Sequence, residues 1–149
     1  MEQLLRKGLI ITLTALFVIA GTQGCKDDYE SVIPYVPIDF NLNKSNIIEL
    51  NIDGGSFYLP NLGYGGIIVF KDMTDNQNPY LAFDATCTYE VSSSVRVEAA
   101  QGNVVAKCPK CGSEFILMGG TGSPVKGPAV EPLRQYRTSY SGNLINIRN

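Results

Sequence analysis

Three cysteines are the residues of this 149-residue chain best suited to chemistry. Cys108 and Cys111 form a Cys-x-x-Cys pair within the segment Lys107–Phe115 (KCPKCGSEF), and Cys87 precedes the pair by about twenty residues. Thiolates bind zinc and iron–sulfur clusters, and a Cys-x-x-Cys pair is a good half-site for a metal. In an oxidising compartment the same pair could close as a disulfide, or Cys87 could pair with either of them, which would leave one thiol over. The residues alone therefore leave a metal site and a disulfide open.

The composition excludes two classes of function. The chain contains no histidine, so a cysteine or serine nucleophile cannot have a histidine base. It carries 12 Lys and Arg against 14 Asp and Glu, a formal net charge of −2. No basic patch stands out that would grip a phosphate backbone, so we expect no nucleic-acid partner.

The N-terminal residues are typical of a targeting signal. The basic stretch Met1–Lys7 is followed by the apolar run Gly8–Ala20, which is shorter than the roughly 18 residues of a membrane-spanning helix. The residues GTQGC then end at Cys25, as in the cleavage site of bacterial lipoproteins. A secreted protein with an unrelated cysteine at this position is the alternative. We predict a signal peptide over residues 1–24, a lipidated N-terminus and tether over 25–38, and one folded domain over 39–149.

Lipidation of Cys25 predicts where the protein is found. The lipid would anchor the chain to a membrane of the cell envelope, as a lipoprotein of a Gram-negative bacterium. The segment KDDYE after Cys25 resembles the acidic signal that sends some lipoproteins to the cell surface, so we expect the outer membrane and an outward-facing domain. Lipidation also leaves Cys87, Cys108 and Cys111 for the folded domain, and an odd number of cysteines cannot all pair as disulfides.

Short apolar runs separated by turn residues follow one another along the rest of the chain. In VPIDFNL, for example, Ile38, Phe40 and Leu42 alternate with polar residues. No stretch shows a helical period over ten residues. We therefore predict an all-β fold, a small sandwich or barrel of short antiparallel strands with two cysteine-bearing loops. The expected strands are VPIDFNL, IIELNI, SFYLP, GIIVFKD, YLAFDA, SVRVEAA, NVVAKC, EFILM and LINIRN.

The cysteine segments and the residues after them resemble the Rieske iron–sulfur family. The order is AFDATC, then CPKCGSEF, then the loop Gly119–Tyr136 (GGTGSPVKGPAVEPLRQY), then a closing strand after Gly142. The resemblance covers roughly Asp39–Ile147 and is most specific in its second half. In that family two loops, with the patterns Cys-x-His and Cys-x-x-His, hold a 2Fe–2S cluster. Here Tyr89 and Cys111 stand at the two histidine positions.

The resemblance implies a Rieske-like fold with an atypical ligand set. Cys87, Cys108 and Cys111 would hold a 2Fe–2S cluster, with Tyr89 or its neighbour Glu90 as the fourth ligand. These ligands carry more negative charge than imidazoles do. The reduction potential should therefore fall towards about −400 mV, as in plant-type ferredoxins.

The resemblance also implies a function. Ser113 would hydrogen-bond a cluster sulfur, as its family counterpart does. The domain would transfer single electrons to or from a redox protein partner, as a carrier or accessory module rather than an enzyme by itself. The alternatives are zinc on the same thiolates, and a cluster-free envelope module that keeps the fold for binding or structure. No oligomeric state is predicted.

Overall fold

The structure is a computed structural model that describes residues 30–149. The predicted signal peptide, the lipidation site Cys25 and the first part of the tether lie outside these residues. Ser31–Asn149 form one compact unit that contains both cysteine loops. Within the described residues, no helix is both long and apolar enough to cross a membrane.

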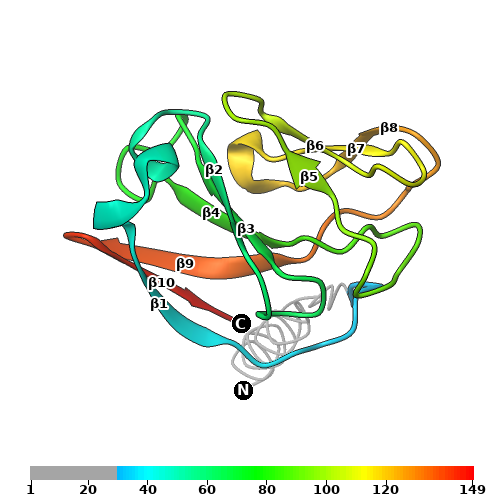
Figure 1. The fold of residues 1–149 in the computed structure, drawn as a ribbon, viewed down its shortest axis with the longest axis horizontal. Helices are drawn as coiled ribbons and strands as arrows, with labels where there is room; N and C mark the ends of the chain where they lie inside the picture. Colours follow the sequence, from blue (N-terminus) through cyan, green and yellow to red (C-terminus); the bar gives the residue numbers. More distant parts are fainter. Residues whose placement is uncertain (1–29) are drawn as a thin grey trace, which may run out of the picture. The chain divides into compact units, whose positions relative to one another are not determined.

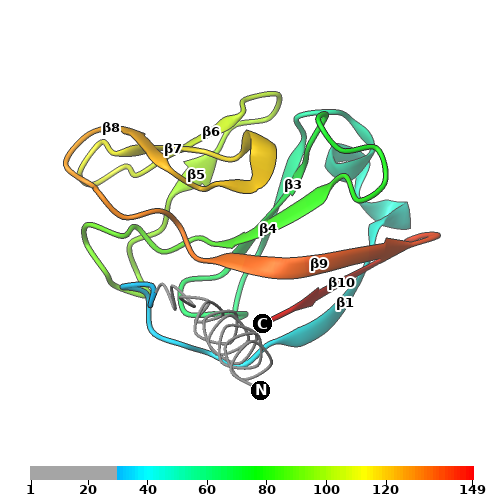
Figure 2. The same cartoon turned by 180° about the vertical axis from the view of Figure 1, so that it is seen from behind.

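The predicted all-β class is confirmed, because the strands described between Ser31 and Asn149 form two antiparallel sheets. The larger sheet has the order β1-β10-β9-β4-β3-β2, and the smaller has the order β5-β6-β7-β8. Figure 1 and Figure 2 show the two sheets from opposite sides. The larger sheet contains β1 (Asp39–Asn43), β2 (Ser56–Leu59), β3 (Ile67–Lys71), β4 (Tyr80–Asp84), β9 (Gln135–Ser141) and β10 (Leu144–Arg148). The smaller sheet contains β5 (Glu98–Ala99), β6 (Val105–Lys107), β7 (Glu114–Ile116) and β8 (Pro124–Lys126).

Two apolar clusters pack against opposite faces of the larger sheet. Strand β3 is buried on both faces, and successive side chains of a strand point to opposite sides. Ile68 and Phe70 therefore join the cluster beneath the smaller sheet, while Ile67 and Val69 join the cluster with β1 and β10. The first cluster includes two of the three cysteines. The base of the candidate site is thus part of the hydrophobic core.

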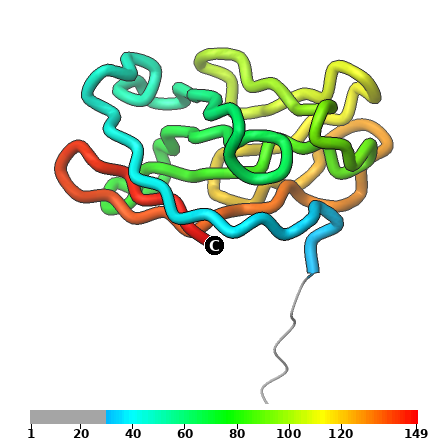
Figure 3. Tube along the Cα trace, turned by 60° about the horizontal axis from the view of Figure 1, so that its bottom comes forward, coloured from blue at the N-terminus to red at the C-terminus, as the bar shows by residue number. Residues whose placement is uncertain are grey.

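The segment 31–38, which the sequence assigned to a tether, belongs to the compact unit. Ile33 is fully buried, and its carbonyl accepts a hydrogen bond of 2.6 Å from the Arg134 guanidinium. The Ile38 N–H donates to the Asn149 side chain at 2.5 Å, and the Ile38 carbonyl accepts from the Asn149 N–H at 3.3 Å. Figure 3 shows the segment running past the C-terminus. These contacts fasten the start of the described chain to both ends of the β9–β10 region.

The strand predicted for IIELNI is wrong. These residues, Ile47–Ile52, contain η2 (Ile48–Asn51), a 3-10 helix that follows another, η1 (Lys44–Asn46). The Asn43 side chain accepts a hydrogen bond from the Ser45 N–H, which caps η1 and turns the chain out of β1. Apolar residues alone therefore misled the prediction, because this segment folds as turns rather than pairing with a strand.

Two strands were missed, and one predicted run is mostly irregular. The run SVRVEAA contributes only the two residues of β5. Strand β9 (QYRTSYS) has few apolar residues and only one buried side chain, Tyr136. It is nevertheless a central strand, because it pairs with both β4 and β10. Strand β8 begins at Pro124, which suits its position at the sheet edge.

Candidate metal centre

A buried carboxylate holds the start of the first cysteine loop. Asp84, the last residue of β4, accepts hydrogen bonds from the N–H groups of Tyr64 (2.7 Å), Gly65 (3.2 Å) and Thr86 (2.9 Å). It also accepts from the hydroxyls of Thr86 (2.5 Å) and Tyr136 (2.8 Å). Burial, together with the negative charge of Asp84, raises the pKa of Tyr136, so this phenol stays protonated and donates. The network fixes the backbone immediately before Cys87.

Cys87 begins the first loop and points into the core. Its N–H donates to the Val95 carbonyl at 3.1 Å, and its carbonyl accepts from the Val91 N–H at 2.9 Å, so the loop closes on itself. The side chain of Cys87 is fully buried. Burial raises the pKa of the Cys87 thiol to about 12, because an isolated thiolate would lose its hydration there.

The second loop is a tight turn between β6 and β7. The Cys108 N–H donates to the Ser113 carbonyl at 2.8 Å, and the Gly112 N–H donates to the Cys108 carbonyl at 3.0 Å. Gly112 has a φ of 77°, a conformation that glycine adopts without strain. The turn leaves Cys108 buried and Cys111 partly exposed.

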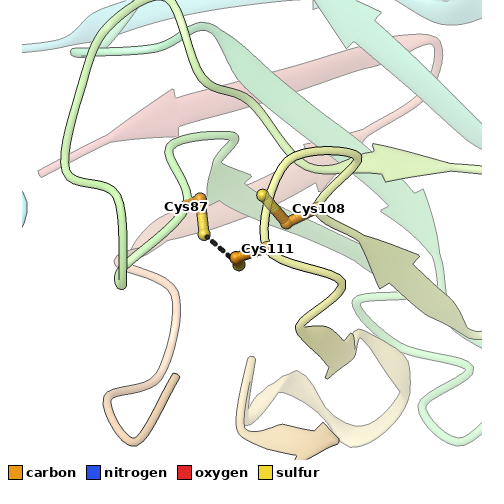
Figure 4. Close-up of side chains that lie close together, drawn as sticks. All are labelled: Cys87, Cys108 and Cys111. Carbon is orange, nitrogen blue, oxygen red and sulfur yellow. Dashed lines mark hydrogen bonds between the residues drawn. The ribbon is translucent and has the colours of Figure 1, made fainter. Parts of the chain in front are cut away.

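The three cysteine sulfurs meet at one point, as the two-loop prediction required. The Sγ atoms of Cys87, Cys108 and Cys111 all lie within 4.8 Å of one another. Those of Cys87 and Cys111 are 3.5 Å apart, and this contact is drawn in Figure 4. All three cysteines are free thiols. These residues, which we call the three-thiol site, could therefore hold a metal ion.

Ser113 links the second loop to the loop that follows β8. Its hydroxyl oxygen accepts hydrogen bonds of 3.1 Å from the Cys111 thiol and from the Ala129 N–H. Burial works to raise the pKa of Cys111, but hydrogen bonding with the side chain and backbone of Ser113 and with the other two cysteines outweighs it, so the pKa of Cys111 is lowered. The structure thus places Ser113 beside the Cys111 sulfur.

A third loop closes over Ser113 at Gly127. A β-carbon on Gly127 would lie 2.5 Å from the Cα of Ser113, and Gly127 has a φ of 92°. The replacement Gly127→Ala should therefore push this loop away and lower the free energy of unfolding by about 2–4 kcal/mol, measured by denaturant titration. Gly142→Ala is the control, because Gly142 also has a positive φ (61°) but has open space around it. Equal losses in the two variants would contradict the steric explanation.

The two candidates for a fourth ligand, Tyr89 and Glu90, have surroundings that differ from those of the three cysteines. Tyr89 is 57% exposed. Glu90 forms an ion pair of 2.6 Å with Lys110, which joins the tips of the two cysteine loops. Among the described His, Cys, Asp and Glu residues, the three cysteines form a group without Glu90. A ligand role for Tyr89 or Glu90 stays a prediction.

The donor set fits one metal ion more closely than a two-iron cluster. Around one tetrahedral ion with metal–sulfur bonds of about 2.3 Å, neighbouring sulfurs are about 3.8 Å apart. The spacing found here, 3.5 Å for one pair and at most 4.8 Å for any pair, is of that size. A 2Fe–2S cluster needs four protein donors, two on each iron, and the described site supplies three grouped thiols. The 2Fe–2S cluster implied by the resemblance stays a prediction.

The thiols should differ in reactivity in the reduced, metal-free protein. In a Cys25→Ser background we expect iodoacetamide to modify one thiol quickly, Cys111, because it is partly exposed and its pKa is lowered. The two buried thiols should follow slowly. Peptide mapping against time measures this, and Cys111→Ser should remove the fast phase. Initial modification at Cys87 or Cys108 would contradict the expected order.

Several supporting residues were not predicted from the sequence. Asp84 and Thr86 lie in the quoted motif AFDATC, but their hydrogen-bond partners Tyr64 and Tyr136 are distant in the chain. Polar residues just before a ligand cysteine were the available signal. Nothing in the sequence around Ala129 indicated that its N–H, from the third loop, would donate a hydrogen bond to Ser113.

Comparisons with known proteins give similarity to solved structures only. No family model matches the chain, and no curated protein matches it. A chain from the complex of reduced oxygenase and oxidized ferredoxin in carbazole 1,9a-dioxygenase is 19% identical, with a TM-score of 0.46 over 64% of this chain and 82% of that one. The Sphingomonas yanoikuyae B1 ferredoxin is 15% identical, with a TM-score of 0.47 over 68% of this chain and 93% of that one. Similarities of this size assign no function, so the proposals below depend on the residues themselves.

Proposed function

We propose that this protein is a one-electron transfer module of the cell envelope, with iron bound by Cys87, Cys108 and Cys111. The observation that carries the proposal is the convergence of three free thiols from two loops within 4.8 Å. Iron in such a site would take up one electron as Fe(III) and release it as Fe(II), with no bond broken. The electron would come from, and pass to, redox proteins of the same compartment.

The surroundings of the thiols suit this role. Two of the three cysteines are part of the core, so their positions are fixed before any metal binds. The loops are closed by backbone hydrogen bonds, and the Lys110–Glu90 ion pair joins their tips. A rigid site changes little between oxidation states. The partly exposed Cys111 gives the site its connection to the surface.

We also propose, from the N-terminal sequence, that a lipid on Cys25 anchors the domain to the outer membrane of a Gram-negative bacterium. The segment Lys26–Glu30 (KDDYE) supports an outward-facing position. Fractionation of cells with the intact chain, compared with Cys25→Ser, tests this. We expect the intact protein in the membrane fraction and the variant outside it.

A second candidate is a zinc-bearing or metal-free module that keeps the fold for binding or structure. The spacing of the sulfurs is compatible with its zinc-bearing form, because a single zinc ion fits that spacing as well as iron does. Without metal, oxidation could join Cys87 to Cys111, whose sulfurs are 3.5 Å apart, and would leave Cys108 as a thiol.

The test is anaerobic purification followed by metal analysis and redox titration. The electron-transfer proposal expects bound iron, visible absorption from sulfur-to-iron charge transfer, and reversible bleaching on one-electron reduction. Colourless protein with zinc, or with one disulfide and no metal, would reject it. Thiol counting before and after chelation separates these two results, since chelation frees zinc-bound thiolates but not a disulfide.

A further inference from the structure

The spacing of the three sulfurs indicates whether they can hold one metal ion or a two-iron cluster. Cys87 and Cys111 come from different loops, yet their sulfurs form the 3.5 Å pair. In the arrangement that the family resemblance implies, these two residues would bind different irons. Two irons bridged by sulfide would hold such a pair farther apart than two ligands of one ion. Two sulfurs only 3.5 Å apart are therefore a pair that a two-iron cluster would separate.

Contacts on three sides hold the loops at this separation. The Lys110–Glu90 ion pair of 2.6 Å joins the tips of the cysteine loops. The Thr88 hydroxyl donates to the Glu131 carbonyl at 2.7 Å, which joins the first loop to the third. Ser113 joins the second loop to the third. A larger group inserted between the sulfurs would act against these contacts.

Among the described residues, no His, Asp or Glu side chain groups with the three sulfurs to fill the fourth position of a tetrahedral ion. Glu90 is directed to Lys110, and Tyr89 is largely in solvent. Cys111 is the partly exposed member of the trio, so the site meets solvent on its side. A small molecule or water can complete the coordination there.

We infer that the three-thiol site binds one thiophilic metal ion through all three sulfurs, with the fourth position left to an exogenous ligand. The inference deepens the proposed function, because it defines the centre as mononuclear. Binding of one divalent ion by the three thiols releases three protons to solvent and leaves a site of net charge −1. The chemical class of ligand is a d-block ion that prefers thiolates, Fe(II) or Zn(II), with Co(II) as its spectroscopic substitute.

The test is titration of the reduced, metal-free full chain with cobalt(II) alone, under anaerobic conditions and with no inorganic sulfide. The Cys25→Ser variant serves, so that the only free thiols are those of the site. We expect sulfur-to-cobalt charge-transfer bands and tetrahedral d–d bands that saturate at one cobalt per chain. The protein as isolated should contain one metal ion per chain and no acid-labile sulfide.

Two results would overturn the inference. One is two irons with acid-labile sulfide in the isolated protein, which would leave electron transfer standing. The other is failure of cobalt, zinc and iron(II) all to bind to reduced protein that circular dichroism shows to be folded. One zinc per chain with no iron would support the mononuclear site and reject electron transfer, so the two proposals can fail separately.

The fourth position has its own test in the cobalt-loaded protein. Added azide or a small thiol should shift the d–d bands, because it takes the open position. Tyr89→Phe and Glu90→Gln should leave the bands of the loaded protein unchanged, as should the control Tyr35→Phe at another exposed tyrosine. A shift in Tyr89→Phe or Glu90→Gln that is absent from the control would show a protein ligand and overturn the open position.

Discussion

Replacement of Cys108 by serine is expected to reduce the metal affinity of the protein by more than about 100-fold, the upper end of the effect of removing residues that only support ligands. Cys108 is fully buried and comes from the same turn as Cys111. Its loss leaves two thiols on two separate loops, which are too few to hold an ion firmly. Competition with a chelator of known affinity, followed through the cobalt bands, measures the change.

The matched control is Cys25→Ser, the same chemical change outside the described fold. It should leave the metal affinity unchanged while it removes the lipidation site. Because a buried serine hydroxyl can itself destabilise the core by about 1–3 kcal/mol, Cys108→Ala is the second variant. Both variants should lose metal and keep the circular dichroism spectrum of a β protein. Unchanged affinity in folded Cys108→Ala would exclude this residue as a ligand.

The sequence predicted the chemistry of the site better than its support. The convergence of three thiols was expected because the cysteine segments resemble the two facing loops of the Rieske family, and turn residues near each cysteine placed it at the end of a loop. The donors to Asp84 could not be predicted in this way. The Tyr136 hydroxyl that reaches Asp84 comes from 52 residues away in the chain. Its strand is polar enough that periodicity did not reveal it. Long-range polar contacts leave no local pattern.

The strand predictions succeeded where side-chain burial decides the structure. Strands β3 and β4 are almost wholly apolar and almost wholly buried, so an apolar run was a reliable signal. Four of the six residues of Ile47–Ile52 are also apolar, but Ile48 is 75% exposed and Leu50 is the buried residue of η2. The buried side chains Ile47 and Leu50 are three residues apart, as in a 3-10 helix, and do not alternate as in a strand. Composition cannot distinguish these cases until the partner strand is known.

Replacement of Asp84 by alanine is expected to lower the free energy of unfolding by about 4–5 kcal/mol, the upper end for a single substitution. The fully buried Asp84 carboxylate accepts five hydrogen bonds from four residues, three from N–H groups and two from hydroxyls. Alanine would leave these donors buried without an acceptor, and each unpaired donor costs about 1–3 kcal/mol where no water reaches it. Denaturant unfolding followed by circular dichroism measures the loss.

Two further variants distinguish the stability lost with the hydrogen-bond network around Asp84 from a general effect of removing a carboxylate. Tyr136→Phe removes one of the five donors and should cost about 1.5–3 kcal/mol, the range for a hydrogen bond to a charged group. Asp53→Ala removes a carboxylate whose side chain is 66% exposed, in an ion pair with Lys71, and should change stability by less than about 1 kcal/mol. The expected order of destabilisation is therefore Asp84→Ala, then Tyr136→Phe, then Asp53→Ala. If Asp84→Ala were no worse than Asp53→Ala, the network would not be what fixes the backbone before Cys87, and the position of that sulfur would have to depend on the closed loop Cys87–Val95 alone.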